Sequence, residues 1–189
     1  MLRTISLTVL LLAAAGPAFA HPGHDGSGFL HPFSGIDHLL VMVGVGLWAS
    51  LLANRKPAAS FLVPGAFVAM MAVGAAAGFA GIKLPLVEAA ILASVFVIGG
   101  LIMGAVRLPA ASAMAVVGLF ALFHGYAHAL EAPATGAGAY ILGFLTATAL
   151  LQGVGLGLGW VVRRGVGDLG LRALGGMMMA GGALVLITN

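Results

Sequence analysis

The sequence of 189 residues contains no cysteine. This absence excludes disulfides, thiolate metal sites and iron–sulfur clusters, so a metal site would have to use nitrogen and oxygen ligands. Charged residues are also scarce, at 7% of the chain, whereas soluble domains carry roughly a quarter. Because 61% of the residues are hydrophobic, too few polar side chains remain to cover a water-exposed surface. The composition predicts an integral membrane protein.

Two further function classes are excluded by the arrangement of residues. The formal net charge is +3 and the pI is about 10.0, but the basic residues are scattered in short pairs between apolar runs, which argues against nucleic-acid binding. The glycine-rich run Gly153–Gly159 lies inside an apolar segment and follows no strand, so it is not a nucleotide-binding loop. Transport driven directly by ATP within this chain is therefore not expected.

Residues 1–20 have the features of a cleavable signal peptide. Arg3 precedes an apolar stretch, Gly16-Pro17 breaks it, and Ala18-Phe19-Ala20 is a small-x-small cleavage pattern. An uncleaved first span is the alternative, but the apolar stretch is short for one. The mature chain is then expected to begin at His21, outside the cytoplasm.

A polar, glycine-rich periplasmic segment, residues 21–34, follows the predicted cleavage site. It carries His21, His24 and Asp25 close to a free amino terminus, which could capture a metal ion weakly at the mouth of a transport path. A solvated tail without function is an equally good interpretation.

Residues 35–189 are predicted to form an all-α, polytopic membrane domain of about six transmembrane helices. Each apolar run is near the ~20 residues that a bilayer core requires. Pro64 is expected in the first turn of the second run, and the 30 glycines of the chain predict a tightly packed bundle. The expected spans are residues 35–53, 61–80, 86–106, 109–130, 137–161 and 169–187.

The positive-inside rule fixes the orientation of these spans. With the mature amino terminus outside, only Lys83 among the basic residues of the mature chain faces the periplasm. This predicts a bacterial inner-membrane protein with both mature termini in the periplasm. The residues expected at the cytoplasmic face are Arg55, Lys56, Arg107, Arg163, Arg164 and Arg172.

The ionisable residues of the predicted spans converge on the periplasmic side. Asp37 and His38 begin the first span, and Glu88 begins the third. His124 and His128 lie one turn apart near the end of the fourth span, and Glu131 continues their face. Charge inside a membrane span is costly and usually functional, so we expect a divalent-metal site built from these groups.

Several structural alternatives remain open for individual residues. Ser34 and Asp37 could form a helix-capping box, and His124 and His128 could make interhelical hydrogen bonds instead of binding metal. For Glu88, a first-turn carboxylate is favoured over a ligand, and for Met42 packing is favoured over soft ligation. Gln152, with Thr146 and Thr148 on the same span, could line an inward path or bond to neighbouring helices.

Two stretches, HPFSGIDHLLVMVGVGLWA from His31 and FHGYAHALE ending at Glu131, together with the signal peptide and six spans, resemble the hydrogenase/urease accessory membrane proteins (HupE/UreJ). These are regarded as secondary nickel permeases. The resemblance implies nickel as the ion, with cobalt as a second candidate, whereas the residues alone indicate only a divalent ion such as nickel, zinc, copper or cobalt. The ligands implied by the family motifs are His31, Asp37, His38, His124 and His128, followed by Glu131.

The leading functional hypothesis is an ATP-independent transporter that carries Ni²⁺, or else Co²⁺ or Zn²⁺, from periplasm to cytoplasm for hydrogenase or urease maturation. One alternative is a membrane-embedded zinc hydrolase using the same histidines, although no further acid/base or oxyanion group is evident. The other is a non-transporting accessory protein. The expected partners are the metal ion and the lipid bilayer, while a homo-oligomer and contacts with maturation proteins are left open.

Overall fold

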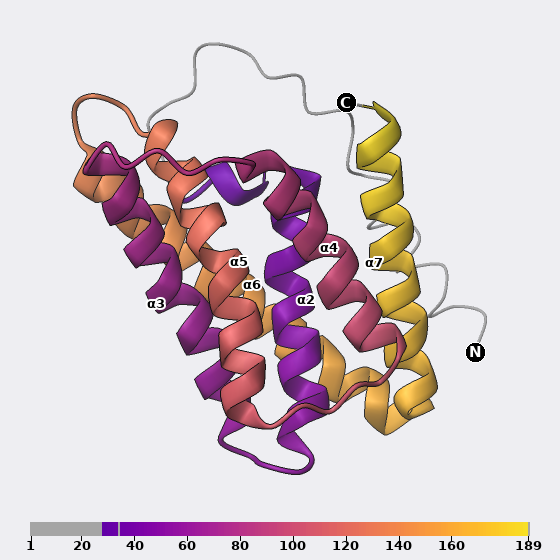
Figure 1. Cartoon of the computed structure of the whole chain (residues 1–189). Helices are drawn as coiled ribbons and strands as arrows, with labels where there is room; N and C mark the ends of the chain where they lie inside the picture. Colours follow the sequence, from indigo (N-terminus) through magenta and orange to yellow (C-terminus); the bar gives the residue numbers. More distant parts are fainter. Residues whose placement is uncertain (1–27, 34, 189) are drawn as a thin grey trace.

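The computed structural model describes residues 28–33 and 35–188, and every regular element within them is helical. The predicted signal peptide and the segment with His21 and His24 lie outside the described residues. The all-α prediction is confirmed, and the six α-helices lie side by side in a bundle (Figure 1). The elements are η1 (His31–Phe33), α2 (Ile36–Ala53), α3 (Ala59–Phe79), α4 (Val87–Met103), α5 (Ala110–Leu130), α6 (Ala137–Val166) and α7 (Asp168–Thr188).

Five of these helices are long and apolar enough to cross a membrane. The remaining helix, α4, has 17 residues, which corresponds to roughly 25 Å of helix, slightly less than a typical bilayer core. The apolar surface of the bundle faces outward, with Leu142, Val154 and Val161 exposed on α6. The chain is therefore a multi-pass membrane protein.

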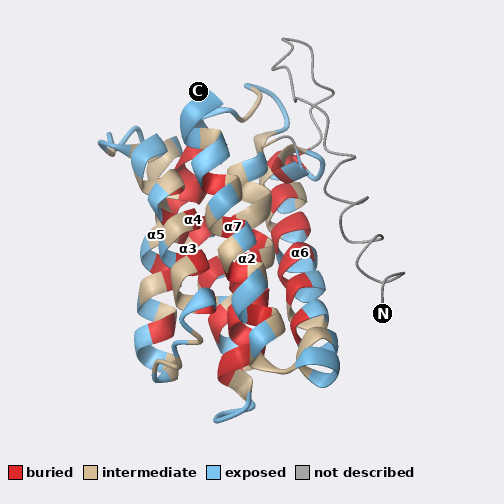
Figure 2. Cartoon of the chain, turned by 90° about the vertical axis from the view of Figure 1, so that its right-hand side faces the viewer, coloured by how far each residue is buried: buried red, intermediate tan, exposed pale blue. Residues whose placement is uncertain are grey.

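The central element of the bundle is α2, which contacts each of the other five α-helices. It is also the most buried of the long spans, and Figure 2 shows the buried residues gathered between the helices. Trp48 on α2 is fully buried and its Nε1 donates a hydrogen bond to the carbonyl oxygen of Val106, at 2.9 Å. Since α2 carries Asp37 and His38 at its first turn, the hub of the fold also positions one half of the predicted site.

Glycine allows several helices to approach to backbone contact. A Cβ atom at Gly125 of α5 would collide with the backbone carbonyl of Met71 on α3, and one at Gly155 of α6 would collide with that of Val43 on α2. Without a hydrophobic drive between helices in lipid, such close packing supplies the attraction that holds them together.

Two sequence-based expectations about helix boundaries were wrong. α3 begins at Ala59, so Pro64 lies inside the helix and not in its first turn; the missing N–H removes one intrahelical hydrogen bond there. α6 continues to Val166, five residues beyond the predicted end. It reaches that far because Gly167 alone turns the chain into α7, with φ 72° and ψ −160°, a conformation open essentially only to glycine.

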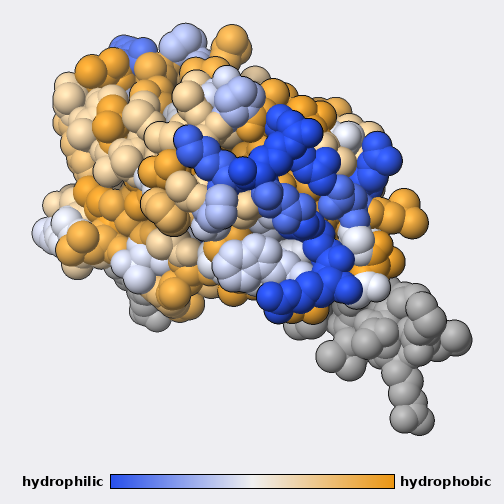
Figure 3. Space-filling view, turned by 90° about the horizontal axis from the view of Figure 1, so that it is seen from below, coloured by the Kyte–Doolittle hydropathy of each residue, from blue (hydrophilic) through white to orange (hydrophobic). Residues whose placement is uncertain are grey.

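Charge divides the bundle into two distinct ends. Six basic residues and one acidic residue lie at one end, a formal charge of +5, and hydrophilic residues form a continuous band across that end in Figure 3. Asp168 accepts a hydrogen bond from Arg107 there and lies 3.4 Å from Nε of Arg163. The opposite end carries Lys83, Asp37, Glu88 and Glu131, one basic and three acidic residues.

Candidate metal centre

The first turn of α2 orients His38 through Asp37. The Oδ1 atom of Asp37 accepts hydrogen bonds from the backbone N–H of His38 at 2.8 Å and from its ring Nδ1 at 2.9 Å. Because a carboxylate only accepts, Nδ1 carries the proton and Nε2 keeps its lone pair. That Nε2 is buried and has no hydrogen-bond partner among the described residues. A carboxylate behind a histidine is the usual support for a metal ligand.

This geometry differs from the capping box considered for the same turn. The residue before the first turn of α2 is Gly35, and among the described residues no side chain caps the helix. Ser34 itself lies outside the described residues. Asp37 is the second residue of α2 and bonds to its neighbour His38, so its carboxylate serves the imidazole as well as the positive end of the helix.

His124 on α5 is fully buried, and its free nitrogen can be identified from its partner. Its Nε2 lies 3.1 Å from Oγ of Ser94 on α4, and that hydroxyl donates its single hydrogen to the carbonyl of Ile91. Nε2 of His124 must then be the donor, which leaves the lone pair on Nδ1. In the part of the chain that the structure describes, that Nδ1 has no hydrogen-bond partner.

His128 follows one turn later and is also fully buried. Its ring stacks on Phe144 of α6, with centroids 4.5 Å apart and an interplanar angle of 16°. Both ring nitrogens are buried, and neither has a hydrogen-bond partner in any described residue. A buried polar group left in this condition costs free energy, so His128 is a strong candidate for a ligand.

His31 and Glu131 form the outer part of the cluster. Nε2 of His31, on η1, lies 2.6 Å from Oε2 of Glu131, which ends α5. The hydrogen bond from His31 lowers the pKa of the Glu131 carboxyl against the opposing effect of partial burial. Ligand atoms of His31, His128 and Glu131 all lie within 4.8 Å of one another, close enough for one ion.

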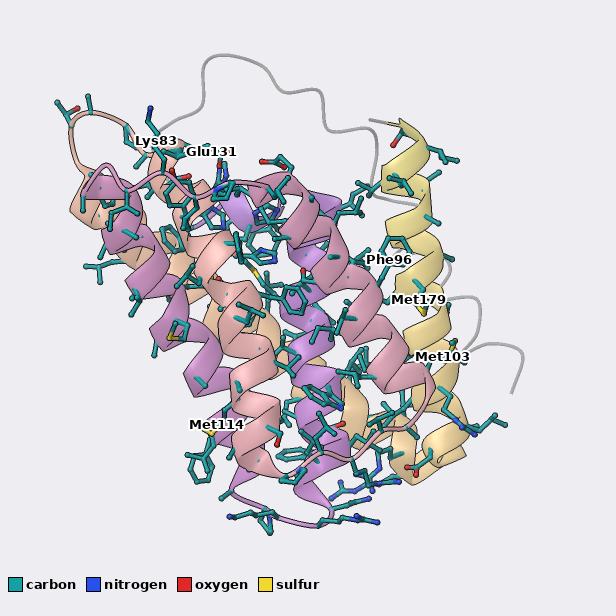
Figure 4. All side chains as sticks on the ribbon, in the orientation of Figure 1. Lys83, Phe96, Met103, Met114, Glu131 and Met179 are labelled. Carbon is teal, nitrogen blue, oxygen red and sulfur yellow. The ribbon has the colours of Figure 1, made fainter. Side chains whose placement is uncertain are left out.

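The imidazoles form a continuous series from the rim of the protein to its interior. The ring centroids of His31 and His128 are 4.9 Å apart, those of His128 and His38 are 5.0 Å apart, and those of His38 and His124 are 4.8 Å apart. Glu131 marks the outer end of the series, at the top of Figure 4. The two sequence stretches thus meet in one cluster, at the end of the bundle opposite the arginines.

The remaining predicted residues lie elsewhere. Glu88 is exposed in the first turn of α4 and forms no hydrogen bond or ion pair with a described residue, which agrees with the favoured first-turn interpretation. Met42 is fully buried below His38, and its sulfur accepts a hydrogen bond from Thr148 at 3.4 Å. Gln152 is 1% exposed, and neither Oε1 nor Nε2 of its amide has a hydrogen-bond partner in the described part of the chain.

Sequence reasoning missed three residues that line the cluster: Ser94, Tyr140 and Phe144. The sequence did contain a feature that could have identified Ser94: it is the only hydroxyl-bearing residue in the predicted third span, where polar groups are rare. No feature of the sequence identified Tyr140 or Phe144. The ring centroid of Tyr140 lies 5.7 Å from that of His31. Aromatic side chains are common in membrane helices for packing alone.

Comparison with known proteins identifies the family to which the chain is similar. The family model described as HupE / UreJ protein matches residues 9–185, nearly the whole chain. The chain belongs to the HupE / UreJ family. Protein HupE of Rhizobium leguminosarum bv. viciae is 42% identical over 188 residues, covering 97% of each chain. No solved structure matches. The HupE / UreJ assignment agrees with the resemblance inferred from the two histidine-containing stretches, which the fold brings into contact.

Proposed function

We propose that this protein is a secondary transporter of divalent transition-metal ions. The ion most strongly indicated is Ni²⁺, with Co²⁺ or Zn²⁺ as alternatives, and it moves from the periplasm to the cytoplasm. The resemblance to nickel permeases of the HupE/UreJ type supports nickel as cargo and a role in hydrogenase or urease maturation. The basic end of the bundle supports a cytoplasmic location for that end.

The observation that carries this proposal is the set of unpartnered nitrogen lone pairs inside a membrane bundle. They belong to Nε2 of His38, Nδ1 of His124 and the ring of His128. Burying a polar group without a hydrogen bond costs roughly 1–3 kcal/mol. Three such groups gathered around the ring of His38 are explained if a cation binds them during part of the functional cycle. Imidazole and carboxylate ligands suit nickel, cobalt, zinc and copper.

The gradient of burial favours a transported ion over a permanently held one. Glu131 is more than half exposed and His31 is 30% exposed, whereas His124 is fully buried. An ion can exchange water for Glu131 and His31 first, and then pass to His128 and His38 without losing all its ligands at once. Weak, sequential sites let an ion enter and leave again.

The direct test is uptake of Ni²⁺ by the purified protein in sealed liposomes. We expect accumulation that protein-free liposomes and liposomes with a His38→Ala variant do not show. Absence of Ni²⁺ movement by correctly inserted wild-type protein would reject the transporter. If the same preparation instead hydrolysed lipid or amide substrates with Zn²⁺, the alternative of a membrane-embedded hydrolase would replace it.

A further inference from the structure

A line of polar and small residues continues from the histidine cluster through the interior of the bundle, between α2 and α6. Along α2 its members recur at every fourth residue, so each lies about one turn beyond the last and the line winds gradually around the helix. These residues are His38, Met42, Gly46 and Ser50 on α2, followed by Asn54 directly after the helix. The facing residues on α6 are Phe144, Thr148, Gln152, Gly159 and Arg163.

Contacts across the interface pair these residues in order. Met42 accepts the hydrogen bond of Thr148. One turn further along both helices, a Cβ atom at Gly46 would collide with the backbone carbonyl of Gln152. One turn further along α2 and about two turns further along α6, a Cβ atom at Gly159 would collide with Oγ of Ser50. The contacts therefore follow both helices in the same direction, from the metal cluster to the basic end.

Gln152 is the feature of this line that packing does not explain. It lies near the middle of α6, about 12 Å of helix below the level of His38 when measured along α2 to Gly46. Its side chain is 1% exposed, yet neither Oε1 nor Nε2 has a hydrogen-bond partner within residues 28–33 and 35–188. A leucine would fill the same space without this cost, so an unpaired amide at this depth indicates a functional role.

The line ends at a cavity of about 430 Å³ at the basic end of the bundle. Asn54, Ser60, Trp160, Arg163 and Arg164 contribute to its wall. Arg163 also donates a hydrogen bond from Nη1 to the backbone carbonyl of Ser50, at 2.9 Å. The guanidinium therefore lies across the point where the interface of α2 and α6 meets the cavity.

We propose that the inner half of the transport route runs between α2 and α6. The side chain of Gln152 is its intermediate polar binding site, between the histidine cluster and the cytoplasmic cavity. This inference rests on the proposed transport function. The amide oxygen of Gln152, with Met42 and Thr148 above it, supplies uncharged ligands that hold a hydrated divalent ion only weakly. Weak ligation suits a site from which the ion must depart.

In the described conformation this route is closed. The glycine contacts bring the two backbones together around Gln152, and Arg163 places positive charge at the cytoplasmic end. A divalent cation cannot pass this point until α6 separates from α2 and Arg163 releases Ser50. The same contacts keep the pathway sealed when no ion is moving.

Replacing Gln152→Leu tests the proposal because it retains volume and removes the amide. We expect the Kd for Ni²⁺, measured by calorimetry in detergent, to stay within about twofold of the wild-type value while liposome uptake falls about tenfold or more. Wild-type uptake in this variant overturns the inference. Parallel loss of binding and uptake also overturns it, because Gln152 would then act through the outer site.

A matched pair of variants covers the case in which Gln152→Leu fails to fold. Thr148→Val changes a buried hydroxyl on the route, whereas Thr146→Val changes an exposed one two residues away that bonds only to the carbonyl of Leu142. We expect slower uptake from Thr148→Val alone, and equal rates for the two variants overturn the inference. If the wild-type protein neither binds nor moves Ni²⁺, the transport function itself fails, an outcome distinct from all of these.

Discussion

The ring of His38 meets the ring of His128 edge-on, with centroids 5.0 Å apart and an interplanar angle of 70°. The two residues lie 90 positions apart in the sequence and belong to different helices. Their contact joins the Asp37–His38 pair at the start of α2 to the histidines near the end of α5. It also gives the proposed ion a series of imidazoles at spacings of about 5 Å.

Asp37 positions His38, and its removal should weaken metal binding without preventing insertion. We expect His38→Ala and Asp37→Ala to abolish Ni²⁺ uptake, and Asp37→Asn to weaken binding by about 10- to 100-fold, the usual effect of losing a carboxylate behind a metal-binding histidine. Calorimetry and liposome uptake measure the two effects. Glu88→Gln is the control, since Glu88 is exposed and apart from the cluster. Equal losses of Ni²⁺ binding and uptake in Glu88→Gln would contradict a specific role for Asp37, because any change at this end of the bundle would then have the same effect.

His128 is expected to lower the folding stability of the metal-free protein while it contributes to Ni²⁺ binding. Because both of its ring nitrogens are buried without partners, His128→Leu should raise the free energy of unfolding of the metal-free protein, by about 1 kcal/mol or more. The same change should weaken Ni²⁺ binding, as should His128→Ala. Thermal unfolding and calorimetry on one preparation test both effects. A less stable leucine variant would indicate that the nitrogens have partners in solution.

Much of the fold was predictable because the membrane imposes it. The six predicted spans overlap all six α-helices, and alternating direction placed Asp37, His124 and Glu131 at one end. The pairing of helices was not predictable, because each helix is apolar on every side and so lacks a stripe that identifies its buried face. For that reason the sequence did not indicate α2 as the hub or α6 as its neighbour.

The fine structure of the cluster depends on that pairing. The hydrogen bond from His124 to Ser94 requires α4 beside α5, and the stacking of Phe144 on His128 requires α6 within side-chain reach of α5. Neither follows from spacing along one helix. Pro64 was misplaced for a related reason: a run of small and apolar residues contains no clear start signal, so α3 could begin at Ala59, ahead of the proline.

The His31–Glu131 contact makes a prediction about pH. The hydrogen bond lowers the pKa of Glu131, so its stabilising effect is complete above the ordinary carboxyl pKa and is lost as pH falls through the lowered value. In metal-free protein, His31→Phe should raise the pKa of Glu131 toward its ordinary value, as measured by carbon NMR of the side-chain carboxyls. The chain has only two glutamates, Glu88 and Glu131, so the Glu131 signal can be assigned readily. An unchanged Glu131 titration would contradict the contact.

Close packing of α2 on α6 can be tested with two glycines of the same helix. Gly155→Ala would place a methyl group against the backbone carbonyl of Val43, whereas Gly153→Ala would meet no atom within 4 Å. We expect the first change to cost about 1–3 kcal/mol of unfolding free energy and the second to be neutral or to stabilise by up to about 1 kcal/mol. Thermal unfolding followed by tryptophan fluorescence in one detergent measures both. Equal effects would mean that the helices are further apart than described.

The orientation in the membrane can be tested directly because the chain has no cysteine of its own. Lys83 and Arg164 are both exposed, and they lie at opposite ends of the bundle. Since basic residues are retained on the cytoplasmic side, Lys83→Cys should react with a membrane-impermeant maleimide in intact cells. Arg164→Cys should react only after the inner membrane is permeabilised. The reverse pattern would place the histidine cluster on the cytoplasmic side and turn the proposed uptake into export.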